Sequence, residues 1–290
     1  MADVTLLENV QNVADEAGYT VAATVVGSTD TTTKQLLAIA NRINDEIAQE
    51  YPWTQLYAAG SITLVDGQAS YALPSAFSWY HYDTFWNQST RWRVLGPMSP
   101  QEYAEIKGYG LNTTVYSRFQ IRGISQNEIL ISPTPDAGSA GQTIIFEYMM
   151  DRSCRPKTWA PATAFGPGSY CSYNGNYYKT VLGGTSGYTP PTWTTGSGND
   201  GGIAWDYYNG SYTKFLADTD VTLFNPKTLE LGMLERFAEI HGLTTILPRY
   251  QAELNKDFSR NIPGKTIWAG GESQATLFAR SGTAIFGTWI

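Results

Sequence analysis

The spacing of apolar residues predicts helices near both ends of the chain. In residues 31–50 an apolar residue recurs at every third or fourth position, which forms one stripe along a helix: Leu36, Ala40, Ile43, Ile47 and Tyr51. Pro52 ends this helix. The same spacing predicts a helix in residues 3–17 and two helical stretches in residues 225–260, with a kink at Pro248.

Between these helices, apolar and polar residues alternate as they do in β-strands. Residues 61–65 and 68–73 flank Asp66-Gly67, a dipeptide that favours the tight turn of a hairpin, so these two strands are predicted to pair. Further strands are predicted at 118–123, 128–132 and 142–150. The chain is therefore expected to be an α+β protein, an α-helical bundle with a small antiparallel β-sheet or barrel domain.

Residues 152–215 have a different composition, with few charged residues and many glycines and tyrosines. The pattern Tyr-Asn-Gly-x-Tyr-x-Lys occurs at 173–179 and again at 208–214, and each Asn-Gly predicts a two-residue hairpin turn. We therefore expect a loop-rich β module inserted into a body formed by residues 1–150 and 216–264. The module resembles the short aromatic β modules of chitin-binding domains and of many phage tail proteins.

The aromatic residues of this module allow two interpretations. Four of them could form a flat platform that contacts a glycan or a partner protein: Tyr177, Trp193, Trp205 and Tyr212. Alternatively, a module of this size needs its aromatic residues to build a small core of its own.

Composition narrows the classes of function. The net charge is −7 and only 16% of the residues are charged, which argues against a surface that grips phosphates through Lys and Arg. An acidic channel through which DNA passes without specific binding is compatible with this charge. The 9 Trp and 19 Tyr residues suit either subunit interfaces or a β-rich core. We expect no secretion signal and no membrane association.

The sequence offers no constellation typical of an enzyme or a metal centre. His81 lies among aromatic residues and His241 at a predicted helix end, where packing suits both better than catalysis or ligation. Cys154 and Cys171 are either free thiols of a protein assembled in reducing cytoplasm or a disulfide that closes a short loop. Residues 199–202 are a turn rather than a calcium loop, because further acidic positions are missing.

Carboxylates in the predicted helices have the spacing of solvated faces rather than of an acid/base pair: Asp45, Glu46, Glu50, Glu230, Glu235 and Glu239. We therefore predict no catalytic residue, no metal and no cofactor.

Residues 265–290 consist mainly of Gly, Ser, Ala and Thr, punctuated by large aromatic residues: Trp268, Phe278, Phe286 and Trp289. Such a segment buries too little apolar surface to fold alone, and it suits insertion into the groove of a partner with ordering on binding. We expect it to be a flexible docking tail.

Three runs, in this order, resemble a known group of proteins: Leu-Pro-Ser-Ala-Phe at 73–77, Arg-Trp-Arg-Val-Leu-Gly-Pro-Met-Ser-Pro-Gln-Glu-Tyr at 91–103, and Leu-Ala-Asp-Thr-Asp-Val-Thr-Leu-Phe at 216–224. The group is the head-to-tail adaptors of short-tailed bacteriophages, which include tail tubular protein A and the portal-binding tail accessory factor. The resemblance covers roughly residues 1–150 and 216–262.

The resemblance implies a structural virion protein rather than an enzyme. Its copies would form a ring, expected to be a dodecamer, that connects the portal protein to the downstream tail tube or nozzle protein and lets DNA pass at ejection. It would be assembled in the host cytoplasm and lie at the head–tail junction. The tail from residue 265 would dock on the portal, and the inserted module could contact tail fibres. Six apolar residues would pack the helices around the ring: Leu36, Ile43, Ile47, Met233, Phe237 and Leu254.

Two alternatives belong to other classes. The chain could be an outward glycan-binding or decorating module of a tail component, for which Trp193 would be essential. It could also be a cell-wall hydrolase, although no pair of residues can be nominated for that chemistry.

Overall fold

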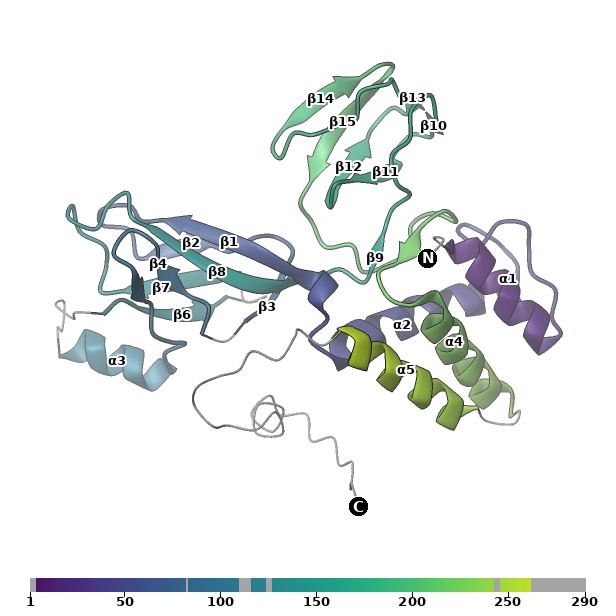
Figure 1. The fold of residues 1–290 in the computed structure, drawn as a ribbon, viewed down its shortest axis with the longest axis horizontal. Helices are drawn as coiled ribbons and strands as arrows, with labels where there is room; N and C mark the ends of the chain where they lie inside the picture. Colours follow the sequence, from purple (N-terminus) through teal and green to yellow (C-terminus); the bar gives the residue numbers. More distant parts are fainter. Residues whose placement is uncertain (1–3, 82, 110–115, 124–126, 243–245, 262–290) are drawn as a thin grey trace.

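The computed structural model describes residues 4–81, 83–109, 116–123, 127–242 and 246–261. Within them, five α-helices and several small antiparallel sheets form a mixed α+β structure, as the sequence predicts. The described strands form open sheets and no closed barrel. Figure 1 shows helices α1 (Leu6–Ala17), α2 (Thr31–Glu50), α4 (Pro226–His241) and α5 (Leu247–Asn261) on one side and a β-rich region with α3 (Pro100–Gly108) on the other. A second β-rich region begins at β9 (Cys154–Arg155). No helix in the described part is long and apolar enough to cross a membrane.

Four helices pack against one another, and α4 contacts each of the other three. They are α1 (Leu6–Ala17), α2 (Thr31–Glu50), α4 (Pro226–His241) and α5 (Leu247–Asn261). The side chains of Thr5, Asp30 and Asn225 cap the first turns of α1, α2 and α4, where backbone N–H groups have no helical partner. The kink predicted at Pro248 is wrong, because α5 begins one residue earlier and a proline is tolerated in a first turn.

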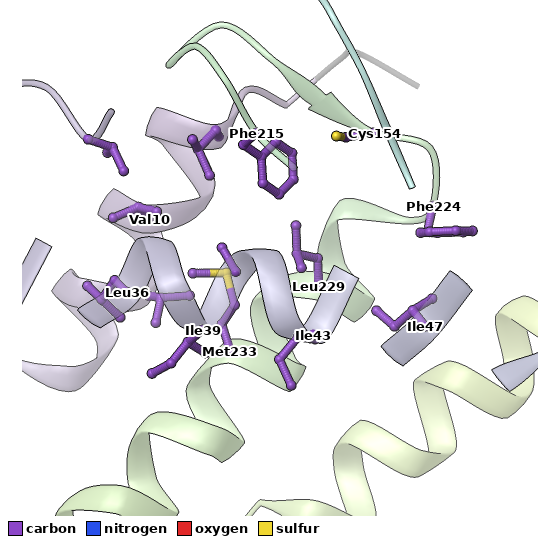
Figure 2. Packing of buried hydrophobic residues seen from close by; sticks show 14 of the residues in the cluster. Val10, Leu36, Ile39, Ile43, Ile47, Cys154, Phe215, Phe224, Leu229 and Met233 are labelled. Carbon is purple, nitrogen blue, oxygen red and sulfur yellow. The ribbon is translucent and has the colours of Figure 1, made fainter. Parts of the chain in front are cut away.

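The apolar stripe predicted for residues 31–50 is confirmed, and α4 and α1 cover it. Figure 2 shows side chains from α2 packed with others from α1, α4 and the connecting segments: Val10, Leu36, Ile39, Ile43, Ile47, Phe215, Phe224, Leu229 and Met233. Burial of one such side chain contributes about 1.5–3 kcal/mol. This core therefore joins residues near the start of the chain to residues beyond 215.

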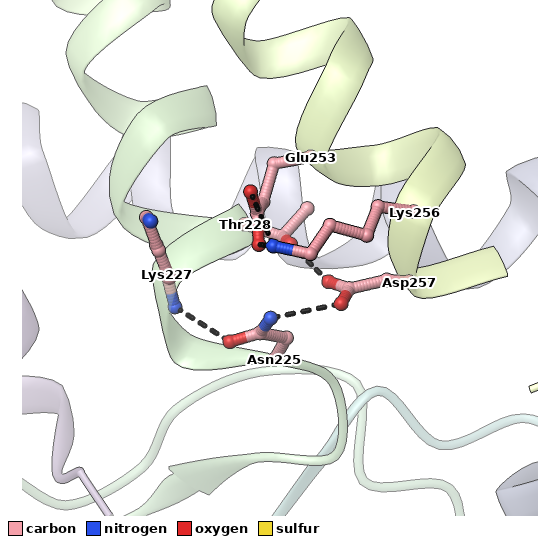
Figure 3. Close-up of polar contacts among 6 residues, drawn as sticks. All are labelled: Asn225, Lys227, Thr228, Glu253, Lys256 and Asp257. Atoms are coloured by element: carbon pink, nitrogen blue, oxygen red, sulfur yellow. Dashed lines mark hydrogen bonds and ion pairs between the residues drawn. The ribbon is translucent and has the colours of Figure 1, made fainter. Parts of the chain in front are cut away.

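A buried carboxylate ties α5 to the start of α4. Asp257 of α5 accepts hydrogen bonds from Asn225 Nδ2, at 2.8 Å, and from the hydroxyl of Thr228 (Figure 3). Asn225 in turn accepts from the backbone N–H of Lys227 at 3.1 Å. A negative charge next to the first turn of a helix is also favoured by the helix dipole. Asp257 thus fixes α5 against α4 through polar contacts as well as apolar ones.

The first β-rich region contains two sheets around one aromatic core. The larger sheet has the order β1 (Tyr57–Thr63), β8 (Thr143–Met150), β4 (Trp86–Asn87) and β5 (Trp92–Arg93), with β3 (Phe77–Tyr80) also paired to β8. The smaller has the order β2 (Ser70–Ala72), β7 (Glu128–Ser132) and β6 (Arg118–Arg122). Phe85 stacks on Phe119 and Phe146, with ring centroids 4.0 and 4.8 Å apart. Helix α3 (Pro100–Gly108) lies beside these sheets and is capped by Ser99.

The hairpin predicted at Asp66-Gly67 is wrong in its pairing. The strand before this turn, β1, pairs with β8 through seven residues, and the strand after it, β2, pairs with β7. The turn itself forms, with Gly67 at φ 74°, but it leads from one sheet to the other. A local turn signal was therefore overridden by long-range pairing.

The second β-rich region has a small core of its own. Its main sheet has the order β11 (Tyr170–Tyr173), β12 (Asn176–Thr180), β15 (Ile203–Tyr208) and β14 (Ser197–Asp200), and β10 (Ala164–Phe165) pairs with β13 (Gly184–Thr185). The chain enters through β9 (Cys154–Arg155) and leaves through β16 (Val221–Thr222), which pair with each other. The hairpin at Asn174-Gly175 is confirmed, with positive φ at both residues. The hairpin predicted at Asn209-Gly210 is wrong, because β15 ends at Tyr208 and pairs with β12 and β14 instead.

Candidate assembly surface

One face of the five-stranded sheet exposes large apolar side chains. Residues directly paired in an antiparallel sheet have their side chains on the same face. Trp86 of β4 pairs with Ile145 of β8, and these residues are 45% and 40% exposed. Trp79 of β3 pairs with Met149 of β8 and is 53% exposed. Ile145 and Met149 are four residues apart, so all four side chains share one face, which we call the outer sheet face.

The other face of β8 is buried, so buried and exposed side chains alternate along the strand. Ile144, Phe146 and Tyr148 face the aromatic core. Trp79 and Trp86 of the outer sheet face are therefore about half exposed to solvent. Covering their apolar surface would contribute about 25 cal/mol of binding free energy per Å² buried. Exposed apolar patches of this kind mark interaction sites, and tryptophan is enriched among residues that dominate binding energy.

Strand β1 borders the outer sheet face and forms a free edge of the sheet. Its seven residues pair with β8 from Tyr57↔Met149 to Thr63↔Thr143, and no other described strand pairs with it. About half of its backbone N–H and C=O groups therefore point away from β8. The strand contains neither a charged residue nor a proline, the usual devices that block an edge. Such an edge can accept an extended peptide as an additional strand.

Charges on the outer sheet face are few and of both signs. Glu147 lies between Ile145 and Met149 on β8, on the same face. Arg93, paired with Trp86 across β4 and β5, forms an ion pair with Asp83. The described residues of this surface offer apolar area to a partner and bring together no nucleophile or acid/base pair.

A buried polar cluster connects the second β-rich region to the helices. Asp220 Oδ2 accepts hydrogen bonds from Tyr212 Oη at 2.9 Å and from the backbone N–H groups of Leu216 and Ala217 at 2.7 and 3.0 Å. Burial raises the pKa of Asp220, and these hydrogen bonds offset part of that rise. Burial, followed by the charge of Asp220, raises the pKa of Tyr212. The cluster holds the segment that returns from this region to α4.

The six residues predicted to pack helices around a ring lie inside the chain's own core. Leu254 is partly buried against this core. The other five are buried in it: Leu36, Ile43, Ile47, Met233 and Phe237. The sequence identified a stripe that must be covered, and α4 of the same chain covers it. A side chain enclosed by its own chain cannot also contact a neighbouring copy, so any such contact would have to use other residues.

The four aromatic residues considered for a glycan platform do not form a flat exposed surface. Tyr177, Trp205 and Tyr212 are 3%, 0% and 2% exposed. Trp193 is partly buried, and its ring lies 5.6 Å from that of Tyr178. Trp205 and Trp193 pack in the small core of the second β-rich region, as the other interpretation expects. Tyr177 and Tyr212 pack instead in the core that the helices share.

The remaining polar candidates have structural roles in the described part of the chain. His81 packs edge-on against Tyr57 at 5.2 Å, and His241 at the end of α4 contacts Phe237 at 4.2 Å. Cys154 and Cys171 are free and buried, and burial raises the pKa of the Cys171 thiol to about 12. No group of three His, Cys, Asp or Glu side chains among the described residues could hold a metal ion.

The turn at 199–202 is built around a carboxylate that is already occupied. Asp200 accepts hydrogen bonds from Trp159 Nε1 at 2.6 Å and from the backbone N–H of Gly187 at 2.8 Å. Several of the helical carboxylates contact side chains of the same helix: Glu46 pairs with Arg42, Asp45 accepts from Gln49, and Glu239 pairs with Arg236. The aromatic residues of the predicted docking tail, Trp268, Phe278, Phe286 and Trp289, lie outside the described residues.

Sequence reasoning missed the outer sheet face. Strands β3 and β4 are short, and the aromatic run around them gave no strand prediction. A signal was nevertheless present, because Phe85 and Asn87 are buried on either side of the exposed Trp86. Alternation over three residues is too short to recognise before the partner strand is known.

The family model described as SU10 adaptor protein matches residues 4–169. The match begins just before α1, spans α2 and the first β-rich region, and ends just after β10. No curated protein matches the chain.

Proposed function

The chain belongs to the SU10 adaptor protein family, and on this premise we propose that it forms a ring that joins the portal to the tail of a phage. Membership makes it a phage adaptor-type protein, a structural component of the virion. The observation that carries the proposal is the family match, which covers helices α1 and α2 together with both sheets of the first β-rich region. An adaptor family is structural, which favours assembly over catalysis as the product of this fold.

We propose that neighbouring subunits meet through exposed apolar residues of the helices. Tyr19, Ile240 and Leu247 are 38%, 52% and 42% exposed. Tyr19 lies just after α1, Ile240 is near the end of α4, and Leu247 is the first residue of α5. Tyr19 packs edge-on against Phe237 at 5.1 Å, which joins the end of α1 to α4. A different patch on the next subunit would receive them, and such a heterologous contact closes a ring when repeated by rotation. A dodecamer is the expected size.

The other surfaces then have assigned partners. The outer sheet face would contact the downstream tail tube or nozzle protein. Residues 152–215 would be a module inserted into the body formed by 1–150 and 216–264, and this module could contact tail fibres. The tail of residues 265–290 would dock on the portal. DNA would pass through a ring whose net charge of −7 per chain avoids tight binding to phosphates.

The test is assembly on purified portal. The protein mixed with portal should co-sediment as a complex larger than portal alone. With Ile240→Asp and Leu247→Asp combined, no more than a few copies of the protein should co-sediment with each portal. Leu182→Asp is the matched control, because this residue is 83% exposed in the second β-rich region, away from the helices. A wild-type chain that stays monomeric with portal would contradict the proposal.

A further inference from the structure

A free strand edge such as that of β1 is unusual in a stable protein, because it promotes association with other chains. It is seven residues long and uncharged, and β8 separates it from β3 and β4, which carry the half-exposed tryptophans of the outer sheet face. Proteins normally shorten, charge or cover such an edge, because its unpaired backbone groups pair readily with other chains. The shorter edge at the opposite side of this sheet, β5, has two residues and carries Arg93. The contrast indicates that β1 receives a strand.

We propose that the terminal segment of the same chain, residues 283–290, adds to β1 as a further antiparallel or parallel strand. This segment reads Thr-Ala-Ile-Phe-Gly-Thr-Trp-Ile. It is rich in β-branched and aromatic residues, which favour strands. Like β1, it contains no charged side chain and no proline, so pairing brings no buried charge. The segment is also long enough to pair with the whole of β1.

The position at which the described chain ends supports this occupant. Phe258, in the last turn of α5, stacks on Tyr51 with ring centroids 3.9 Å apart. Tyr51 lies only a short way before the start of β1 at Tyr57, so the end of α5 lies near one end of the free edge. Residues 262–282 connect the two and can span up to about 70 Å when extended. A strand of the length of β1 is about 23 Å long, so the segment can reach every part of β1.

The side chains along β1 leave room for large neighbours. Of the four residues on the outer side of β1, Ala59, Ser61 and Thr63 are small and exposed, and Tyr57 at the start of the strand is half-buried. In an added strand, Ile285 and Trp289 would lie on one face and Phe286 and Ile290 on the other. Either face placed outward would set a large apolar side chain beside a small one and extend the outer sheet face.

Pairing of residues 283–290 with β1 does not require the ring proposed above. If the tail also docks on the portal, the same aromatic residues would have to leave β1 when the portal is met. One segment would then protect the edge in the free protein and bind the portal in the assembly.

Hydrogen exchange measured by mass spectrometry on the free protein tests the proposal. In the full chain, the amides in residues 57–63 that point away from β8 should be protected. In a chain that stops at residue 282 these amides should exchange at least tenfold faster, whereas β8 and α2 should exchange unchanged. Ile285→Pro in the full chain, which blocks strand pairing without shortening the chain, should behave like the truncation.

The controls separate the alternatives. A synthetic peptide of residues 283–290 added to the truncated chain should restore protection, and the same peptide with Pro at position 285 should not. Equal exchange of residues 57–63 in the full and truncated chains would overturn the proposal. Protection that appears only at high protein concentration would overturn it as well, because the strand would then come from a second copy. Loss of portal binding with unchanged exchange would leave the proposed function standing and this inference refuted.

Discussion

Replacing Asp220 by Ala should destabilise the protein by about 2–4 kcal/mol at neutral pH. The substitution leaves the buried Tyr212 hydroxyl without its acceptor, which costs about 1–3 kcal/mol, and it frees two part-buried backbone N–H groups at about 0.5–1.5 kcal/mol each. Removal of a desolvated charge offsets part of this loss. Asp220→Asn is the matched control: all three donors bond to Oδ2, so an amide oxygen in that place keeps every hydrogen bond.

The pH dependence of wild type and Asp220→Asn gives a second readout. Burial raises the pKa of Asp220 above its ordinary value of 3.8, so between these two pKa values the folded protein holds a proton that the unfolded chain has already released. The contribution of this group to stability is therefore greatest at low pH and is lost as pH rises through the raised pKa. Across that window the stability of Asp220→Asn minus that of wild type should increase with pH, by at most about 1.4 kcal/mol per pH unit, and it should level off above the raised pKa.

Urea denaturation followed by tryptophan fluorescence measures both effects, with the slope of the transition checked for each variant. The reasoning is refuted if Asp220→Ala lies within about 0.5 kcal/mol of wild type at neutral pH. It is also refuted if Asp220→Asn is as damaging as Asp220→Ala.

Packing at three other places gives further predictions. Gly60→Ala should lower the free energy of unfolding by about 1–3 kcal/mol, because an added Cβ would overlap the ring of Phe146. Ala59→Ser, on the exposed side of the same strand, should leave stability unchanged, and thermal melting of the two variants compares their stabilities. Asp257→Ala should destabilise the packing of α5 by about 1–3 kcal/mol, because Asn225 and Thr228 lose their hydrogen-bond acceptor. Hydrogen exchange should then show faster exchange of amides in α5 only. The buried Cys171 thiol, with its pKa raised to about 12, should not react with a thiol reagent at about pH 8 until urea is added; rapid reaction of the native protein would contradict its burial.

The helices could be predicted from the sequence because their apolar stripes are long and regular. Over residues 31–50 the stripe runs the whole length of the helix, which begins and ends where Asp30 and Pro52 indicate. The strand pairing could not be predicted, because Asp66-Gly67 carries only local information while the pairs between β1 and β8 join residues about 85 apart in the sequence.

The candidate site was harder to predict for a related reason. Leu36 and Met233 were recognised as apolar residues in need of cover, yet sequence cannot tell whether the cover comes from the same chain or from a neighbour. The same holds for Trp205, which is typical both of a sugar platform and of a core. Trp79 and Trp86 share a face only because β3 and β4 both pair with β8, which no local pattern reveals.

Electron cryomicroscopy of the portal incubated with this protein tests the central claim most directly. We predict a closed ring of many copies on the tail-facing end of the portal, with helices α1, α2, α4 and α5 in lateral contact and an open channel along its axis. Portal particles without added density, or with single copies bound at scattered positions, would contradict the account.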